Sequence, residues 1–369
     1  MWCLAPEPRL VPGTRAPFRA RYRRARADGA GKLCTVRRLI FATQRLDPAD
    51  PVLAATVPMV RALADRVDEL VVLCDSAVAD AVPANARVHE FGARTQAERG
   101  ARYTAALARE LRPRPIGVVA HMVPLYAVLA APLVRPLGIP LVLWYTHWKG
   151  HSVVRAAERV CTAVVSVDPR SFPLASTKVR GIGHGIDVAE FACSDAPDDG
   201  GPLRALVLGR YSPAKGLETV LRGAALAGDV RLEAHGSTGD GEYDAHKREL
   251  ERLAAELRLD AELAGPVPRA EIPALFARSD VLVNNMRAGA PDKVVYEAAA
   301  SCLPVLASNP VFDDLLPPEL RFDRDDPESL ADRLRTLDRR RRPELRALVA
   351  ANHSVEHWAD GVLATVEER

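Results

Sequence analysis

The sequence lacks the cysteine patterns of metal-binding and disulfide-rich domains. Its six cysteines are scattered along 369 residues, and no C-x-x-C pair or Cys/His cluster has zinc-ligand spacing. We therefore expect no structural metal, and a reducing compartment. The chain is 48% hydrophobic and 27% charged. These values are ordinary for a globular protein and exclude disorder throughout.

Long apolar runs are also missing. The longest, Val123–Val134, is interrupted by Pro124 and Pro132, and it is far shorter than the roughly 20 residues that cross a bilayer. The sequence therefore predicts no membrane-spanning helix. The amino-terminal segment lacks the apolar core of a secretory signal, so we expect a cytoplasmic protein.

The charge is small in total, at +2, but it is unevenly distributed. Residues 1–38 carry ten Arg or Lys against two acidic residues, whereas residues 39–369 carry 40 basic and 46 acidic ones. Three interpretations of the basic extension stay open: a disordered tail or a start placed too early, an anchor on the anionic inner face of a membrane, and a transit peptide. We expect the fold to begin near Arg38.

A second basic run, Arg339–Arg342, has no interleaved aromatic residues. Nucleic-acid patches usually combine basic with aromatic side chains. We therefore expect a solvated surface turn here and no nucleic-acid partner.

Short apolar runs recur along the rest of the chain, with segments of helical periodicity between them. One such segment places Leu250, Leu253, Ala254 and Leu257 on a single helix face that ends near Arg258. Apolar strands that alternate with helices predict parallel sheets covered on both faces, which is the doubly wound α/β class. The expected strands are Leu39–Thr43, Leu70–Cys74, Ile116–Ala120, Pro140–Trp144, Ala163–Val167, Ala205–Gly209, Val230–Ala234, Val281–Val283 and Val305–Ala307.

One acidic segment rich in Gly and Pro interrupts this series, and we interpret it as a linker at residues 187–202. It separates two predicted Rossmann-like domains, residues 38–186 and 203–348, which would face each other across a ligand-binding cleft. Residues 1–37 form the Arg-rich extension. Residues 349–369 contain an amphipathic helix, expected at Ser354–Glu368, with Val355, Trp358, Val362 and Val366 on its apolar side.

The most specific motif follows the expected strand Ala205–Gly209. Arg210 and Lys215 lie in the loop after Gly209, before a helix that starts around Gly216. Doubly wound sheets bind ligands at the carboxyl ends of their strands. A guanidinium and a mobile ammonium together suit a diphosphate.

A second motif, Arg287–Ala307, follows the strand Val281–Val283 and contains a Gly/Pro loop and then a helix. The free amides around Lys293 and Val294 at the start of the next helix favour an anion. Glu297 lies one turn inside that helix, where its carboxylate can accept hydrogen bonds from a ribose diol. The alternative for Glu297 is a solvated position on the helix.

The sequence resembles family 4 retaining glycosyltransferases of the two-domain GT-B fold, and the resemblance covers residues 39–369. The segments that carry it are Gly209–Gly216, Gly265–Val267, Ile272–Val283 and Glu297–Ala307. It implies two facing doubly wound domains and a carboxyl-terminal helix that returns to the first. It also implies that Arg210 and Lys215 hold the donor diphosphate, that Pro266 and Val267 contact the base through their backbone, and that Glu297 binds the ribose.

The sequence departs from the family motif at one carboxylate. The family has two glutamates eight positions apart, and the first falls on Gly289. Asp292 and Lys293 precede the helix instead, as in a D-K-x-V-x-E variant. Two roles stay open for Asp292: replacing the missing carboxylate, or capping the helix.

In the first domain, two histidines follow expected strands. The resemblance matches His147 to the family histidine beside the donor sugar and phosphate, and His121 less closely to a cleft-lining position. Either could instead be a core histidine. His184 occupies a family turn and is expected to be structural, whereas Asp47 lies in an acceptor-side loop that lacks the family's glycine pair.

These features predict a retaining glycosyltransferase in glycan, glycolipid or glycoconjugate synthesis, with His147, Arg210 and Lys215 as its catalytic residues. The donor would be a UDP- or GDP-sugar, the acceptor a sugar, a lipid-linked or another small molecule, and no metal or further cofactor is expected. A nucleotide-sugar epimerase and a non-catalytic nucleotide-sugar binder are alternatives. A dehydrogenase is disfavoured because no G-x-G-x-x-G follows the first strand.

Overall fold

The computed structural model describes residues 36–50, 53–195, 200–239 and 241–368. The chain divides into residues 1–36 and 37–369, and the fold described below is that of the second unit. Residues 1–35 lie outside the described part. They make up almost all of the Arg-rich extension, so the three interpretations of that extension also concern residues outside the described part.

The first half of this unit contains a seven-stranded parallel sheet in the order β5-β3-β1-β6-β7-β8-β9. Along β1, Leu39 and Phe41 face one side while Ile40 and Ala42 face the other, and all four are buried, so the sheet is covered on both faces. A short parallel pair, β2 (Arg45–Leu46) and β4 (Ser76–Ala77), lies beside it. The strands are β1 (Arg38–Ala42), β3 (Glu69–Cys74), β5 (Ala86–Glu90), β6 (Gly117–His121), β7 (Leu141–Trp144), β8 (Ala163–Ser166) and β9 (Val179–Gly181).

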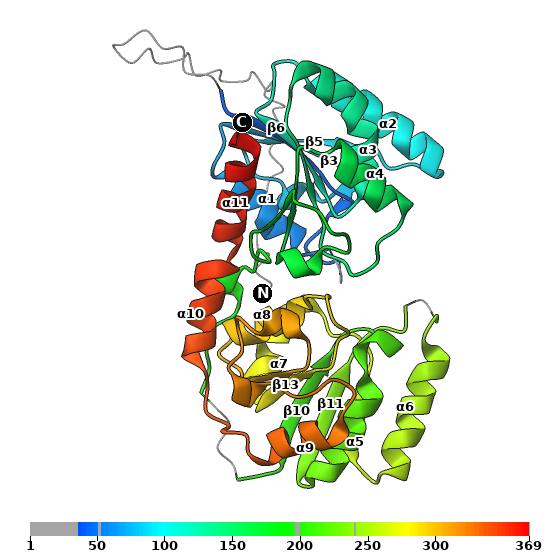
Figure 1. The fold of residues 1–369 in the computed structure, drawn as a ribbon, viewed down its shortest axis with the longest axis vertical. Helices are drawn as coiled ribbons and strands as arrows, with labels where there is room; N and C mark the ends of the chain where they lie inside the picture. Colours follow the sequence, from blue (N-terminus) through cyan, green and yellow to red (C-terminus); the bar gives the residue numbers. More distant parts are fainter. Residues whose placement is uncertain (1–35, 51–52, 196–199, 240, 369) are drawn as a thin grey trace, which may run out of the picture. The chain divides into compact units, whose positions relative to one another are not determined.

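Helices cover both faces of this sheet, as Figure 1 shows. Helices α2 (Gln96–Glu110), α3 (Pro124–Val134) and α4 (Ser152–Val160) pack on the Ile40 face. Helix α1 (Thr56–Ala64) packs on the opposite face together with the last helix, α11 (Val355–Glu367).

The second half contains a five-stranded parallel sheet in the order β12-β11-β10-β13-β14. Its strands are β10 (Leu203–Leu208), β11 (Val230–His235), β12 (Asp260–Ala264), β13 (Val281–Asn284) and β14 (Val305–Ala307). Its helices are α5 (Leu217–Ala227), α6 (Asp244–Glu256), α7 (Ile272–Arg278), α8 (Lys293–Ala300), α9 (Pro327–Arg335) and α10 (Pro343–Asn352). The expected fold class, doubly wound α/β with two parallel sheets, is therefore confirmed.

The expected last helix begins at Val355, where the Ser354 side chain accepts a hydrogen bond from the His357 amide at 3.2 Å. The Trp358 ring packs edge-on against Phe41 of β1 and Trp144 of β7. The predicted apolar side of this helix, Val355, Trp358, Val362 and Val366, is buried. The helix therefore packs on the first sheet although it follows the second half in sequence.

The segment expected to be a linker is fastened to the second half. A disulfide joins Cys193 to Cys302, which follows α8, with a Cα–Cα distance of 5.2 Å. The Arg346 guanidinium of α10 donates to the carbonyl oxygens of Phe191 and Ala300. The spacing of the cysteines along the sequence contains no sign of this bond.

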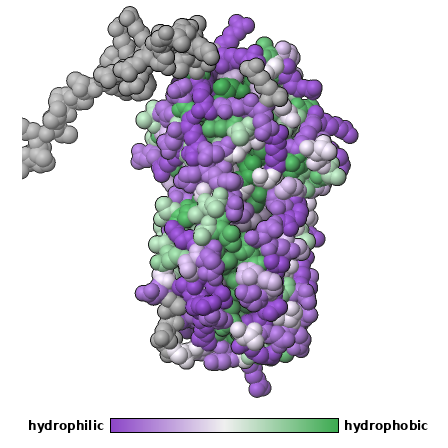
Figure 2. All heavy atoms as spheres, turned by 60° about the vertical axis from the view of Figure 1, so that its left-hand side comes forward, coloured by the Kyte–Doolittle hydropathy of each residue, from purple (hydrophilic) through white to green (hydrophobic). Residues whose placement is uncertain are grey.

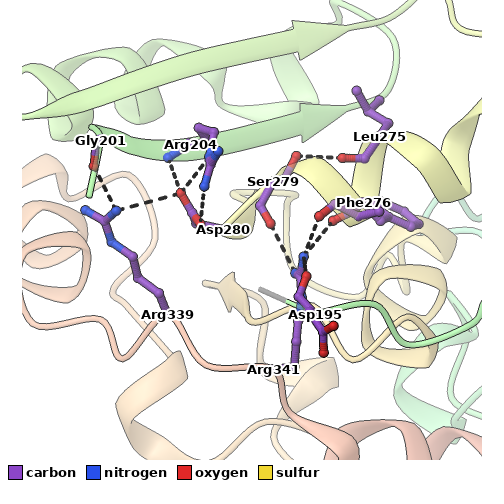
Figure 3. Close-up of polar contacts among 10 residues, drawn as sticks. Asp195, Gly201, Arg204, Leu275, Phe276, Ser279, Asp280, Arg339 and Arg341 are labelled. Carbon is purple, nitrogen blue, oxygen red and sulfur yellow. Dashed lines mark hydrogen bonds and ion pairs between the residues drawn. The ribbon is translucent and has the colours of Figure 1, made fainter. Parts of the chain in front are cut away.

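The run Arg339–Arg342 is not a solvated turn, which corrects the expectation. The carbonyls that end α7 have no helical partner, and the Arg341 guanidinium donates to Ala277 at 2.7 Å and to Ser279 at 3.1 Å (Figure 3). Arg342 is buried, Arg339 and Arg341 are half-buried, and of the four only Arg340 is exposed. Tertiary packing around α7 therefore uses charges that the sequence pattern assigned to solvent.

All nine expected strands are present, with shifts of at most two residues at their ends. The remaining strands of the two main sheets, β5, β9 and β12, lie at sheet edges. Their side chains are partly or fully exposed, so these strands lack the continuous apolar run that marks a central parallel strand.

Polar residues cover most of the face in Figure 2, with hydrophobic residues in smaller groups between them. Within the described residues, no helix is long and apolar enough to cross a membrane.

Candidate functional site

The loop after β10 brings a lysine back to the end of its own strand. Gly209 has φ of 137°, and a side chain there would begin only 2.4 Å from the Lys215 ammonium. Glycine is therefore favoured by the backbone conformation, whereas the flexible Lys215 side chain could move aside. Lys215 forms an ion pair with Asp292, which follows β13. Arg210 is exposed and has no ion pair in the described part of the chain.

These residues lie on both sides of the point where the strand order of the second sheet reverses. The chain runs from β10 outward through β11 and β12, and then returns to β13 on the other side of β10. Ligands of doubly wound folds bind at this reversal, outside the carboxyl ends of the strands. Lys215 and Asp292 therefore meet at the expected ligand position.

Asp292 uses its carboxylate for side-chain contacts instead of capping α8. Its Oδ2 accepts hydrogen bonds from Lys215 and, at 2.7 Å, from the Asn284 amide. No side-chain bond caps the start of α8. Two roles were left open for Asp292, and the structure contains no hydrogen bond of the capping kind.

Gly289 has φ of 78°, a left-handed conformation that glycine adopts readily.

Glu297 is buried and paired, not solvated. Its Oε1 accepts a hydrogen bond from Arg269 at 2.9 Å, and the same guanidinium bonds Glu190 at 2.6 Å. Burial, opposed by the charge of Glu297, lowers the pKa of Lys293 to about 8. The first turn of α8 thus combines free amides with an ammonium that titrates near neutral pH.

His121 lies at the corresponding reversal point of the first sheet. The chain runs outward from β1 to β3 and β5, and then returns to β6 beside β1. The His121 Nδ1 is 3.0 Å from the Thr43 hydroxyl, which directly follows β1. Burial and the charge of Lys293 lower the pKa of His121 to about 3, which leaves the ring neutral.

The orientation of His147 follows from one backbone contact. The Lys149 amide donates to His147 Nδ1 at 2.9 Å. An accepting Nδ1 carries no proton, so the neutral ring has its proton on Nε2. Burial, and then the charges of Lys149 and Arg210, lower the pKa of His147, which favours this neutral form. His147 therefore presents a hydrogen-bond donor.

An aromatic contact connects this loop with the second half. The Trp148 ring stacks on His147, with centroids 5.6 Å apart. The Arg287 guanidinium lies 4.1 Å from the Trp148 ring centroid, a cation–π distance. The sequence carries no sign of this pair, because Trp148 lies in the first half and Arg287 lies in the Gly/Pro loop of the second motif.

The remaining candidate residues have different surroundings. Asp47 accepts a hydrogen bond from the Ala49 amide at 2.9 Å, which is a local loop contact. Pro266 and Val267 follow β12 at the edge of the second sheet. The His184 ring is buried, with Nε2 3.3 Å from the Pro291 carbonyl oxygen. Among the described residues, no group of three or more His, Cys, Asp or Glu could hold a metal ion.

Residues 202–339 match the family model described as glycosyl transferases group 1. Among curated proteins, none matches this chain in sequence.

The fold is similar to that of several solved GT-B structures. HepE of Anabaena with UDP and glucose has 16% identity and a TM-score of 0.71, over 91% of this chain and all of that one. Sucrose-phosphate synthase of Thermosynechococcus elongatus has 16% identity and a TM-score of 0.69, over 89% and 98%. A glycosyltransferase of Rickettsia africae has 12% identity and a TM-score of 0.68, over 90% and 98%. The fold of the chain is therefore GT-B.

Proposed function

We propose that this protein is a glycosyltransferase that moves a sugar from a nucleoside-diphosphate sugar to an acceptor hydroxyl. One observation carries the proposal: Lys215, Asp292 and the amino end of α8 meet where the strand order of the second sheet reverses. This arrangement lies within the segment that matches the glycosyltransferase model. The solved HepE structures, which hold UDP or UDP-glucose, support a UDP-sugar as the first donor to test, beside GDP-sugars.

In the proposed reaction, the bond between the sugar C1 and a diphosphate oxygen breaks, and C1 bonds to the acceptor oxygen. The acceptor proton passes to an oxygen of the leaving diphosphate. Negative charge grows on that diphosphate as the first bond breaks. Arg210, Lys215 and the amides near Val294 would stabilise it, because donors that are already in place need no reorganisation during the reaction.

Asp292 gives Lys215 a defined position before any donor binds. The ion pair holds the ammonium at the end of β10, while Arg210 has no competing carboxylate in the described part of the chain. We infer that Arg210 meets the diphosphate directly and that Asp292, while it holds Lys215, lies beside the transferred sugar in place of the carboxylate missing at Gly289.

His147 would donate a hydrogen bond through Nε2 to the sugar or to the phosphate beside it. Its role is one of orientation, because a neutral ring whose Nδ1 already accepts a backbone bond has only this donor to offer. His121 would line the acceptor side together with Thr43, and Asp47 lies in a loop on that side.

Glu297 would bind the ribose. Arg269 occupies Oε1, which leaves Oε2 to accept a hydrogen bond from a ribose hydroxyl. Pro266 and Val267 would contact the base through their backbone. The proposal also includes retention of the anomeric configuration and membership of family 4. It places the protein in glycan or glycolipid synthesis and in the cytoplasm, with or without contact with an anionic membrane.

A thermal-shift panel of UDP- and GDP-sugars tests donor binding first. A ligand at 100 times its Kd adds about 2.7 kcal/mol of stability when it binds only the folded state. Absence of a shift with every member of the panel would contradict the proposal. Product NMR with the donor that binds then distinguishes retention from inversion by the anomeric coupling.

Gly289 supports a second candidate, a nucleotide-sugar binder without transferase activity, because the family carboxylate is missing at that position. The same protein sample separates the candidates. Donor binding without transfer to any acceptor and without slow hydrolysis would favour the binder. Conversion of the donor to its epimer without an acceptor would instead favour an epimerase.

A further inference from the structure

Tyr211 lies directly after the proposed phosphate-binding residue Arg210, but its side chain points into the protein. The side chain is 3% exposed. Its hydroxyl oxygen lies 2.9 Å from the Ala234 carbonyl oxygen and 2.7 Å from that of Ala264. A carbonyl oxygen can only accept, so the tyrosine proton is donated at the carboxyl ends of two neighbouring strands, β11 and β12.

Backbone contacts tie the same places together. The Gly209 amide donates to His235 at 2.9 Å, and the Tyr211 amide donates to Ser237 at 3.0 Å. Gly236 approaches the loop so closely that a side chain there would begin 1.8 Å from the Gly209 carbonyl oxygen. The loop after β10 and the loop after β11 are therefore in direct backbone contact.

The segment after β12 is also contacted by His235, which ends β11. The His235 Nδ1 lies 3.3 Å from the Gly265 carbonyl oxygen, and its Nε2 lies 2.6 Å from the Glu233 carboxylate. Arg278 also pairs with Glu233. Tyr211 and His235 thus contact the two consecutive residues, Ala264 and Gly265, that precede the proposed base-contacting segment Pro266–Val267.

We propose that Tyr211 is a positioning residue that sets the distance between the phosphate-binding loop, Gly209–Gly216, and the base-contacting segment, Pro266–Val267. The inference rests on the proposed function, because it assigns a base to the segment after β12. Backbone contacts with a base cannot be adjusted by the side chains of Pro266 and Val267 themselves. Their position depends on whatever holds Ala264 and Gly265.

This arrangement has a specific consequence for donor recognition. A nucleoside diphosphate touches both loops at once, whereas inorganic pyrophosphate touches only the phosphate-binding loop. Loss of the Tyr211 hydroxyl should therefore weaken the binding of nucleoside diphosphates and leave the binding of pyrophosphate unchanged. The loss of one buried hydrogen bond corresponds to roughly a 3- to 10-fold change in Kd.

The experiment compares Tyr211→Phe with Tyr103→Phe by isothermal titration with UDP, GDP and pyrophosphate. Tyr103 is a matched control, because its buried hydroxyl also donates to a carbonyl, that of Tyr126 at 3.1 Å, but in the first half. We expect Tyr211→Phe to raise the Kd of whichever nucleoside diphosphate binds, with an unchanged Kd for pyrophosphate, and Tyr103→Phe to change neither.

A second variant, His235→Asn, removes the neighbouring contact with Gly265 and is expected to act in the same direction. Equal weakening of pyrophosphate and nucleoside diphosphate would show a general disturbance of the phosphate loop and overturn the inference. Unchanged affinities in both variants would also overturn it while leaving the proposed function intact. If the wild-type protein binds neither UDP nor GDP, the proposed function fails first.

Discussion

The carboxyl edges of the two sheets carry different chemistry. In the second half, charged groups are held in pairs: Lys215 with Asp292, and Arg269 with Glu297 and Glu190. In the first half, the two candidate histidines are neutral, His121 bonded to Thr43 and His147 bonded to a backbone amide, although other strands of that sheet are followed by ion pairs, Asp75 with Arg99 and Asp168 with Arg170. The hydroxyls of Thr146 and Ser166 there have no hydrogen-bond partner among the residues that the structure describes.

Under the proposed function, this difference corresponds to a division of work between the halves. Charge that develops on a diphosphate needs cations and amides that are already in place, and these lie in the second half. An acceptor hydroxyl needs neutral hydrogen-bonding partners that do not compete for the phosphate. The following predictions test this comparison, beginning with the largest expected effect.

Removal of either cation in the second half should affect turnover most. Arg210→Ala and Lys215→Ala are each expected to lower the rate of transfer by on the order of 10² to 10³, the typical effect of losing one such donor. The measurement is the initial rate of nucleoside-diphosphate release with the donor identified by thermal shift.

Arg222→Ala is the control for these two variants. Arg222 is an exposed arginine on α5 that pairs with Glu218 one turn away, so its loss should leave the rate nearly unchanged. Near-normal rates in both Arg210→Ala and Lys215→Ala would contradict the role of these cations in stabilising the diphosphate.

Within the run Arg339–Arg342, two neighbouring arginines should differ sharply in stability. Arg341→Ala removes hydrogen bonds to the end of α7 and should cost about 1.5 to 3 kcal/mol in the free energy of unfolding. Arg340→Ala is the control, because this side chain is exposed and should stay within about 0.5 kcal/mol. Urea unfolding of both variants gives the two values, and equal losses would show that the contacts at α7 contribute nothing specific.

His147 should contribute less than the cations, because it offers one neutral hydrogen bond. His147→Phe is expected to lower kcat/KM roughly 3- to 10-fold, while His147→Gln, which keeps a donor, should recover part of the loss. Steady-state kinetics with a saturating acceptor measures both. A loss as large as that of Arg210→Ala would indicate a charged role for His147 and break the neutral half of the comparison.

The smallest effect should be a pH dependence from Lys293. With a pKa of about 8, this ammonium is charged below that pH and neutral above it. Affinity for an anionic ligand should therefore fall a few-fold as the pH rises from 7 to 9. UDP titrations across this range test the direction, with Lys293→Met as the control, and a slope that persists in the variant would assign the titration to another group.

Most of the fold could be predicted from the sequence. Central parallel strands are buried on both faces, so β1, β6 and β10 appear as continuous apolar runs. The edge strands β5, β9 and β12 were missed because half-exposed strands carry mixed residues that resemble loops. The last helix was predicted because its apolar positions repeat with the helical period.

The site could be predicted only in part. Gly209, Lys215 and the start of α8 lie in local patterns, in which glycine, charge and a helix start stand close together in the sequence. The partner of Asp292, the bond between Arg269 and Glu297 and the contact of Arg287 with Trp148 could not be predicted. Each joins residues from different parts of the chain, and their spacing along the sequence carries no signal.

The sequence by itself determined which residues are available at each strand end, because apolar periodicity sets the strands and glycine permits the tight turn at Gly209. Only the tertiary structure decided which of those residues meet. The reversal of strand order places the loops after β10 and β13 side by side, and it turns a lysine and an aspartate 77 residues apart into one ion pair. Sheet topology is a long-range property, so chemistry that depends on it becomes visible only when the strands are in place.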